Sequence, residues 1–149
     1  MKKIIFTVYG EPVGKGRPRF SRAGKGVRTY TPEKTAEYEL AVSRAFRRAV
    51  HTGGFEKGTP IDMEITAYFA VPKSVSKKKK AELLTGQLRP TKKPDADNVV
   101  KIICDALNGV AYADDAQVVS VSIEKKWATE PCVIVKMGEV TAGDDEVPF

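Results

Sequence analysis

The sequence predicts an α+β domain in which helices pack on a single mixed sheet, in the order β-α-β-(α)-α-β-β. Two observations support this prediction. Apolar and polar residues alternate over residues 61–69, as in a strand with one buried face. Apolar residues recur at helical spacing over residues 32–51 and 94–108. The chain has 149 residues, enough for one domain of ordinary size, and we expect a single layer of helices on a sheet.

The first half of the chain begins with a predicted strand, because residues 3–9 are mostly β-branched or aromatic. Residues 10–30 are rich in glycine, proline and arginine and predict a basic loop or a loose hairpin. We expect the first helix to follow over residues 32–51, with Thr31 as its N-cap and Pro32 at its first position.

The second half of the chain predicts two helices and two strands after the strand at 61–69. Ser76 is placed to cap a short helix that runs through Leu84. Residues 94–108 are apolar on most of their helical circumference, which predicts a buried helix. Strands are predicted from Val118 to Trp127 and from Cys132 to Met137, joined by a turn at residues 129–131.

The composition limits the kinds of partner and of active site that the chain can have. The chain carries 25 Lys and Arg against 19 Asp and Glu, a net charge of +6, which favours a polyanionic partner such as nucleic acid. His51 is the single histidine, which excludes a histidine-rich zinc site. Cys104 and Cys132 lie in apolar stretches and are expected to be reduced thiols in the cytosol. No segment has the length of a membrane span, so we expect no membrane association.

Two pairs of aspartates are the most informative feature. Asp95 and Asp97 stand at the entrance of a predicted helix, with Lys101 one turn after Asp97. Capping is the ordinary role of such residues. Asp114 and Asp115 follow in the turn after the same helix. Carboxylates beside a lysine on a basic chain suit Mg²⁺ bound next to a phosphodiester, where the lysine can stabilise charge on the phosphate.

Three short motifs carry a resemblance to a known family. They are D-A-D-N-V-V-K at residues 95–101, D-A-L at 105–107 and D-D-A-Q-V-V at 114–119. In order and spacing they resemble the RusA family of Holliday-junction resolvases, densely over residues 92–121 and more loosely elsewhere. The resemblance implies a RusA-like fold and a homodimeric crossover junction endodeoxyribonuclease that cuts four-way DNA symmetrically with Mg²⁺.

The same resemblance implies roles for particular residues. Asp95, Asp97 and Asp115 would be the metal-binding carboxylates and Lys101 the catalytic lysine, whereas the role of Asp114 stays open. The implied setting is DNA recombination and repair in the cytoplasm of a bacterium or a phage-infected cell. A homodimer is also expected from symmetry, because a two-fold junction needs two matched cuts and a two-fold dimer supplies two equivalent sites.

Two basic stretches are predicted to contact phosphates of the junction arms, which positions DNA without reading its sequence. A solubilising charged face is the alternative for the lysine run at residues 77–80. The predicted DNA-binding residues are Lys15, Arg17, Arg19, Arg22, Arg28, Lys73, Lys77, Lys78, Lys79, Lys80, Lys92 and Lys93.

The C-terminal tail differs from the rest of the chain. Residues 139–149 carry only negative charges, so the total of +6 divides into −4 for this tail and +10 for the predicted nuclease domain, residues 1–138. The tail is expected to be flexible. Its tip resembles the acidic tip, ending in Pro-Phe, of bacterial single-stranded-DNA-binding proteins, which implies recruitment of proteins that bind that tip, whereas a second possibility is that the tail covers the basic groove. The tip consists of Asp144, Asp145, Glu146, Val147, Pro148 and Phe149.

Two other functions remain open from sequence. Asp95 with Glu124 and Lys126 could form a restriction-type PD…(E)xK site, although such a site places its carboxylates on strands. The chain could instead be a non-catalytic junction-binding protein that recruits partners through its tail, with its aspartates serving only as caps. Loss of Mg²⁺-dependent cutting in an Asp97→Asn variant that still binds DNA would separate these possibilities.

Overall fold

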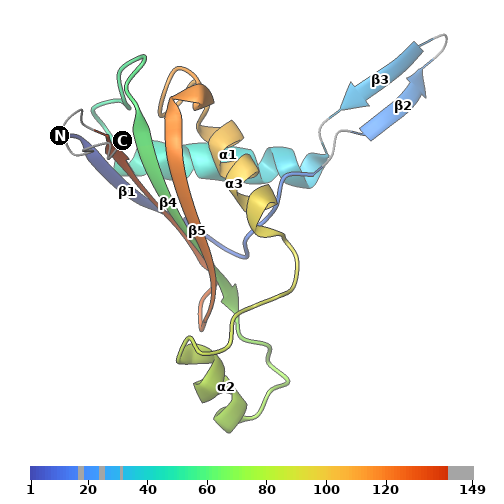
Figure 1. Ribbon diagram of the computed structural model, residues 1–149. Helices are drawn as coiled ribbons and strands as arrows, with labels where there is room; N and C mark the ends of the chain where they lie inside the picture. Colours follow the sequence, from blue (N-terminus) through green and yellow to red (C-terminus); the bar gives the residue numbers. More distant parts are fainter. Residues whose placement is uncertain (17–18, 24–25, 31, 141–149) are drawn as a thin grey trace, which may run out of the picture.

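A computed structural model describes the backbone of residues 1–16, 19–23, 26–30 and 32–140, and the side chains of residues 1–16 and 32–140. Four strands form one mixed sheet (Figure 1). Its neighbouring strands are antiparallel except for the last pair, which is parallel. In spatial order the strands are β1 (Lys3–Tyr9), β6 (Cys132–Glu139), β4 (Ile61–Ala70) and β5 (Val118–Ala128).

Two long helices cover one face of this sheet. They are α1 (Glu33–Ala49) and α3 (Ala96–Leu107), and they pack against each other as well as against the strands (Figure 1). The parallel pair β4 and β5 requires a long crossover, and this crossover carries α3 and the short helix α2 (Lys77–Leu84). The predicted α+β class with a single mixed main sheet is therefore confirmed.

The core lies between the sheet and the two helices. Along β4 every second side chain is buried, and Ile61, Met63 and Ile65 are almost completely inaccessible. The alternation found in the sequence thus marks one face of a central strand. On α3 four apolar side chains have no exposed surface, and Phe46 of α1 packs edge-on against Phe6 of β1 at 5.7 Å between ring centroids. The buried side chains of α3 are Val99, Ile102, Ile103 and Leu107.

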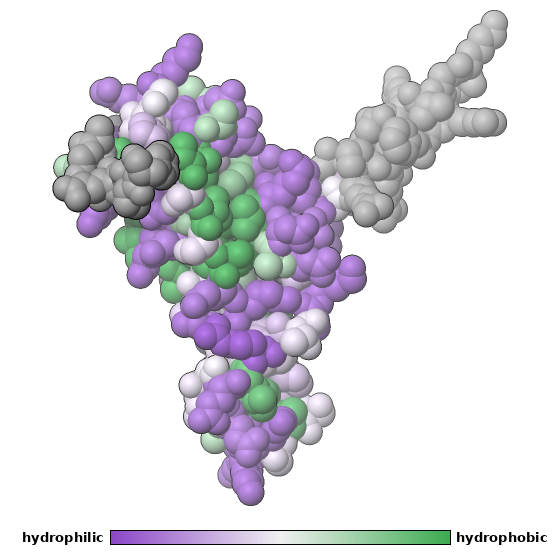
Figure 2. Space-filling view, in the orientation of Figure 1, coloured by the Kyte–Doolittle hydropathy of each residue, from purple (hydrophilic) through white to green (hydrophobic). Residues whose placement is uncertain are grey.

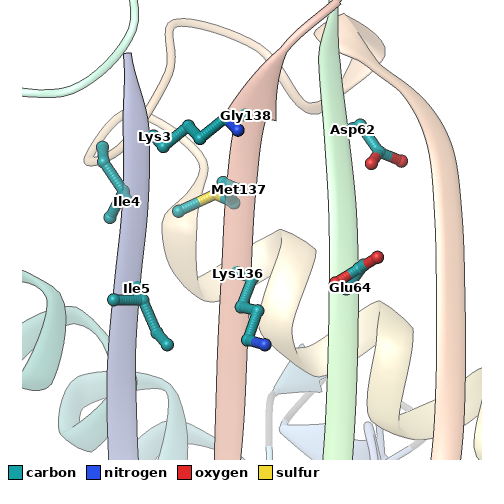
Figure 3. A pocket seen from close by; sticks show the side chains of 8 residues that line it. All are labelled: Lys3, Ile4, Ile5, Asp62, Glu64, Lys136, Met137 and Gly138. Carbon is teal, nitrogen blue, oxygen red and sulfur yellow. The ribbon is translucent and has the colours of Figure 1, made fainter.

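The other face of the sheet has no helix on it among the described residues and carries a shallow hollow of about 380 Å³ (Figure 3). Lys3 and Lys136 lie on its β1 and β6 side, and Asp62 and Glu64 lie on its β4 side. Gly138 has no side chain and leaves space between Lys3 and Asp62, with which it is in register. Because this face is turned away from α3, the hollow is separate from the aspartates that the sequence singles out.

The basic segment after β1 forms a hairpin, which was one of its two predicted forms. Strands β2 (Arg19–Ala23) and β3 (Gly26–Tyr30) pair antiparallel as a separate two-stranded sheet. The hairpin extends away from the body of the molecule beside the N-terminal end of α1 (Figure 1). Residues 17, 18, 24, 25 and 31 lie outside the described residues.

The predicted helix boundaries are correct to within two residues. At the start of α1, Pro32 takes the N-cap position and not the first helical position, and Thr31 lies outside the described residues. Ser76 caps α2 as predicted, since its hydroxyl accepts a hydrogen bond from the Lys79 amide at 3.2 Å.

The connection at residues 129–131 passes the end of β4, so β5 and β6 are not neighbours in the sheet. In the part of the chain that the structure describes, no helix is long and apolar enough to cross a membrane.

Candidate active site

The first predicted carboxylates lie where the chain enters α3. Asp95 is at the N-cap position, and its carbonyl accepts the first helical hydrogen bond from the Val99 amide at 3.1 Å. Its carboxylate makes no capping hydrogen bond. Asp97 lies in the first turn, and both side chains are exposed. Neither carboxylate has an ion-pair partner among the described residues, so capping does not account for the pair.

A polar stripe runs along the exposed side of α3. Asp97, Lys101 and Asp105 are four residues apart, which places them one above another over about 12 Å at 1.5 Å per residue. The Lys101 ammonium lies 3.6 Å from the Asp105 carboxylate. The Lys101 side chain is 64% exposed, whereas that of Asp105 is only 23% exposed. Asp105 belongs to the D-A-L motif but was not among the predicted catalytic residues.

The second pair of aspartates divides into two roles. Asp114 caps the 3-10 turn η1 (Asp115–Gln117), because its carboxylate accepts from the Ala116 amide at 3.0 Å. The Gln117 side chain completes a capping box by accepting from the Asp114 amide at 3.2 Å. The amide of Ala116 lowers the pKa of Asp114. Asp114 thus has a structural role that accounts for its carboxylate.

Asp115 lies beside the end of α3. Its pKa is raised, first by its hydrogen bond with Asp114, then by partial burial and by the charges of Asp114 and Asp105. The charge of Lys101 opposes this rise. Asp115 therefore lies within electrostatic range of Asp105 and Lys101.

The structure separates the predicted metal ligands into two groups. Asp95 and Asp97 lie at the beginning of α3, whereas Asp115 follows its end. Within the described residues no three acidic, histidine or cysteine side chains are close enough to hold a metal ion. The donor set still fits Mg²⁺, which takes one or two carboxylates together with waters and substrate phosphate oxygens. The alternative donors fit less well, since His51 lies beyond the end of α1 and burial raises the pKa of the Cys104 thiol.

A short segment between β1 and β2 is held against both helices. The Lys15 amide donates to the Asn98 carbonyl of α3 at 2.9 Å. The Lys15 ammonium lies 2.6 Å from Glu39 of α1 and 3.2 Å from Asp105 of α3. The sequence predicts Lys15 only as a phosphate contact and gives no role to Glu39. These contacts were missed because the partners of Lys15, Glu39 and Asp105, lie 24 and 90 positions away from it in the chain.

Two glycines make this close approach possible. A Cβ on Gly14 would lie 2.8 Å from the Pro94 Cβ and 3.0 Å from the Asn98 Cβ. A Cβ on Gly16 would lie 2.7 Å from the Thr35 hydroxyl, which accepts the Gly16 amide hydrogen bond at 3.1 Å. Such distances leave no room for a side chain, so the pair of glycines determines how the hairpin leaves the body.

A groove of about 900 Å³ lies between this segment and the start of α3. Asp95 and Asn98 line it together with Lys34, Lys92 and Lys93. Lys15 and Glu11 line it as well, so the groove combines four lysines with two carboxylates, an excess of positive charge that suits a phosphate-bearing ligand. In the orientation of Figure 1, Figure 2 shows hydrophilic surface on the side where the hairpin leaves the body and a hydrophobic area in the middle, over β5.

Lys92 is anchored by aromatic side chains at the groove. Its ammonium lies 5.6 Å from the ring centres of both Phe69 and Trp127, a cation–π arrangement. The Lys125 ammonium donates to the Lys92 carbonyl at 2.6 Å and lies 5.2 Å from the Phe69 ring. These contacts fix the chain immediately before Asp95.

The remaining predicted DNA-binding residues lie on two separate parts of the molecule. Lys73 and the lysines at 77–80 are exposed on or just before α2, at the opposite end of the molecule from the β2–β3 hairpin (Figure 1). The side chains of Arg19, Arg22 and Arg28 belong to the hairpin and lie outside the described residues, as does all of Arg17. The tip at residues 144–149 also lies outside them.

The restriction-type alternative is not supported by the fold. Glu124 and Lys126 pair with each other at 3.2 Å. They are in register with Thr66 and Tyr68, on the sheet face away from the helices. Asp95 begins a helix on the helix-covered side, so the three residues do not form one site.

Comparison with known proteins agrees with the motifs. The family model described as Endodeoxyribonuclease RusA matches residues 9–138 of the chain. A protein of Bacillus subtilis (strain 168), named Uncharacterized protein YqaN, is 43% identical over 148 residues, covering 95% of this chain and the whole of that protein.

The glycine contacts give a direct test of the site's assembly. Gly14→Ala is expected to lower the free energy of unfolding by about 1–3 kcal/mol, because the new methyl group overpacks against Pro94 and Asn98. Gly138→Ala is the matched control, since its Cβ would meet only Lys3 at an ordinary 3.8 Å. Urea denaturation measures both, and equal stabilities of the two variants would contradict the close approach at Gly14.

Proposed function

The chain belongs to the RusA endodeoxyribonuclease family, and from this premise we propose that it is a Mg²⁺-dependent endonuclease that resolves four-way DNA junctions. It does so by paired, symmetric phosphodiester cleavage during DNA recombination and repair, in the cytoplasm. The observation that supports this proposal most is the exposed pair of carboxylates at the start of α3, Asp95 and Asp97, of which Asp95 lines a groove with four lysines. A binding protein has no need of unpaired carboxylates at a surface that must accept a polyanion.

The proposed catalytic groups act on one phosphodiester. Asp95, Asp97 and Asp115 are the proposed Mg²⁺ ligands; since α3 separates Asp115 from the other two, we propose that the ion binds one group directly and the other through its own waters. When bound, Mg²⁺ lowers the pKa of an attacking water and stabilises the departing alkoxide. The exposed Lys101 ammonium, one turn along α3 from Asp97, donates to a phosphate oxygen and stabilises its developing charge.

The proposed DNA path follows the basic side chains. Lys92 and Lys93 contact the backbone beside Asp95, the arginines of the β2–β3 hairpin hold one arm, and the lysines of α2 hold another. These contacts act on phosphates and so contribute to affinity without reading bases. Two copies of the chain related by a two-fold axis supply the two cuts that a symmetric junction requires.

Cleavage of a synthetic four-way junction with mapped cut sites tests the activity. The wild-type chain is expected to cut two strands at symmetric positions with Mg²⁺ and not with EDTA. Asp97→Asn should lower the cleavage rate by about 10²–10³-fold while the junction Kd stays unchanged, because the variant removes a metal-binding charge and not a phosphate contact.

Asp62→Asn is the matched control, since Asp62 lines the hollow on the other face of the sheet. It should cut at the wild-type rate. Cutting retained in Asp97→Asn would overturn the site assignment. Binding without cutting by the wild-type chain would favour the non-catalytic alternative, a junction-binding protein that recruits partners.

The hairpin's contribution is tested by the salt dependence of junction binding. The double variant Arg17→Ala, Arg19→Ala should flatten the slope of log K against log salt by about 2, because two phosphate contacts are lost. Arg47→Ala, Arg48→Ala removes two exposed arginines from the last turn of α1, at the other end of that helix, and serves as the control. An unchanged slope in the hairpin variant would remove Arg17 and Arg19 from the interface.

We also propose, from sequence alone, that the tip at 144–149 recruits proteins that bind the acidic tip of single-stranded-DNA-binding protein. A chain ending at residue 143 should lose binding to a purified protein of that class, measured by calorimetry, and keep its cleavage rate. Faster cleavage by the shortened chain would instead indicate that the tail covers the groove, and no change in either assay would leave the tail without a role.

A further inference from the structure

Asp105 lies between two ammonium groups that come from different parts of the chain. Lys15 approaches the Asp105 Oδ2 atom to 3.2 Å, and Lys101 approaches the same atom to 3.6 Å. Lys15 is also 2.6 Å from Glu39. The closer ammonium, that of Lys15, belongs to a side chain only 20% exposed, whereas Lys101 is mostly exposed. Of the two cations beside Asp105, Lys15 is therefore the nearer and the less exposed, although it does not belong to α3.

Lys15 is fixed in this position by its backbone. Its amide bonds to Asn98, and the glycines on either side of it pack against α3 and α1 without space for a Cβ. Burial acts to lower the pKa of Lys15, but the hydrogen bonds and charges of Glu39 and Asp105 outweigh burial, and the pKa is raised. Lys15 thus stays a cation at neutral pH and occupies a prepared place between two carboxylates.

We propose that Lys15 is a positioning residue that shares the charge of Asp105 and so weakens the hold of Asp105 on the Lys101 ammonium, which stays available to the scissile phosphate. This inference rests on the proposed function for its consequence in catalysis, and on the contacts of Asp105 for its geometry. It gives Lys15 a role different from direct contact with DNA, because both Glu39 and Asp105 already engage its ammonium.

Removal of Lys15 would strengthen the pairing of Lys101 with Asp105. Asp105 is a partly buried carboxylate and would keep only one of its two neighbouring cations. Lys101 lies four residues earlier on the same helix, at the spacing where side chains pair. Its ammonium, already 3.6 Å from Asp105, would become the only cation paired with that carboxylate among the described residues and would be held closer to it. Replacing Asp105 by a neutral residue in the variant that lacks Lys15 would release Lys101 from this pairing.

The test is a double-mutant cycle on the full-length chain. Lys15→Met should lower the single-turnover cleavage rate of a four-way junction by at least about 10-fold, with the junction Kd within about 2-fold of wild type. Lys15→Met combined with Asp105→Asn should cut at the rate of Asp105→Asn alone. Lys15→Arg should retain activity, because it keeps the cation.

A second readout is independent of cleavage. The reactivity of the Lys101 amine towards an acylating reagent, measured by mass spectrometry, should fall in Lys15→Met and recover in the double variant. Lys15→Met with Glu39→Gln shows whether an unpaired Glu39 causes any loss of stability.

Two outcomes would overturn the proposal. A weakened Kd with an unchanged cleavage rate would make Lys15 a phosphate contact or a tether of the hairpin. Unchanged reactivity of Lys101 in Lys15→Met would show that Asp105 does not compete for it. If the wild-type chain cut no junction, the proposed function would fail, and the reactivity of Lys101 would still decide the geometric part.

Discussion

The burial of one side of α3 against the sheet is the constraint on which the candidate site depends. Val99, Ile102, Ile103 and Leu107 lose all their exposed surface there. At about 25 cal/mol per Å² of apolar area, four such side chains contribute several kcal/mol to folding. Because this packing sets the rotation of the helix about its axis, it also determines that the stripe from Asp97 to Asp105 faces outwards. The apolar and the charged sides of α3 are two consequences of one packing arrangement.

The second constraint is steric and comes from a segment that has no regular structure. Gly14 and Gly16 let the backbone pass between the first turns of α1 and α3. The segment in turn carries Lys15 to two carboxylates, one on each helix. The base of the basic hairpin is therefore attached to the same helix that presents the aspartates. A DNA-binding element and a reactive surface are connected over a few residues, without a separate domain.

Most of the fold could be predicted because its elements are locally consistent. The alternation of apolar and polar residues over β4 indicates a strand with one buried face. The apolar circumference of α3 indicates a largely buried helix. The order of the strands could not be predicted, since nothing in the local pattern of β6 indicates that it lies between β1 and β4. The motifs identified Asp95, Asp97, Lys101 and Asp115, but they did not indicate that α3 separates them into two groups.

The contacts of Lys15 show a different limit of sequence reasoning. A lysine between two glycines in a basic segment is most simply interpreted as a phosphate contact. Its partner Asp105 lies 90 positions further along the chain, and only the packing of α1 against α3 brings the two together. The spacing of residues on one helix predicts pairs such as Lys101 and Asp105. That spacing does not indicate that Lys15, from a distant part of the chain, also pairs with Asp105.

The central place of β6 has a consequence for synthesis of the protein. The last strand to be translated pairs on one side with β1, the first strand, and on the other with β4. Until β6 is available, these two strands have no neighbour on that side, and the sheet beneath α1 and α3 is incomplete. Contacts between the two ends of a chain form late, because a long loop must close before they stabilise anything. A nuclease built in this way gains its working surface only when β6 has been made, so a fragment that ends before β6 does not carry the assembled site.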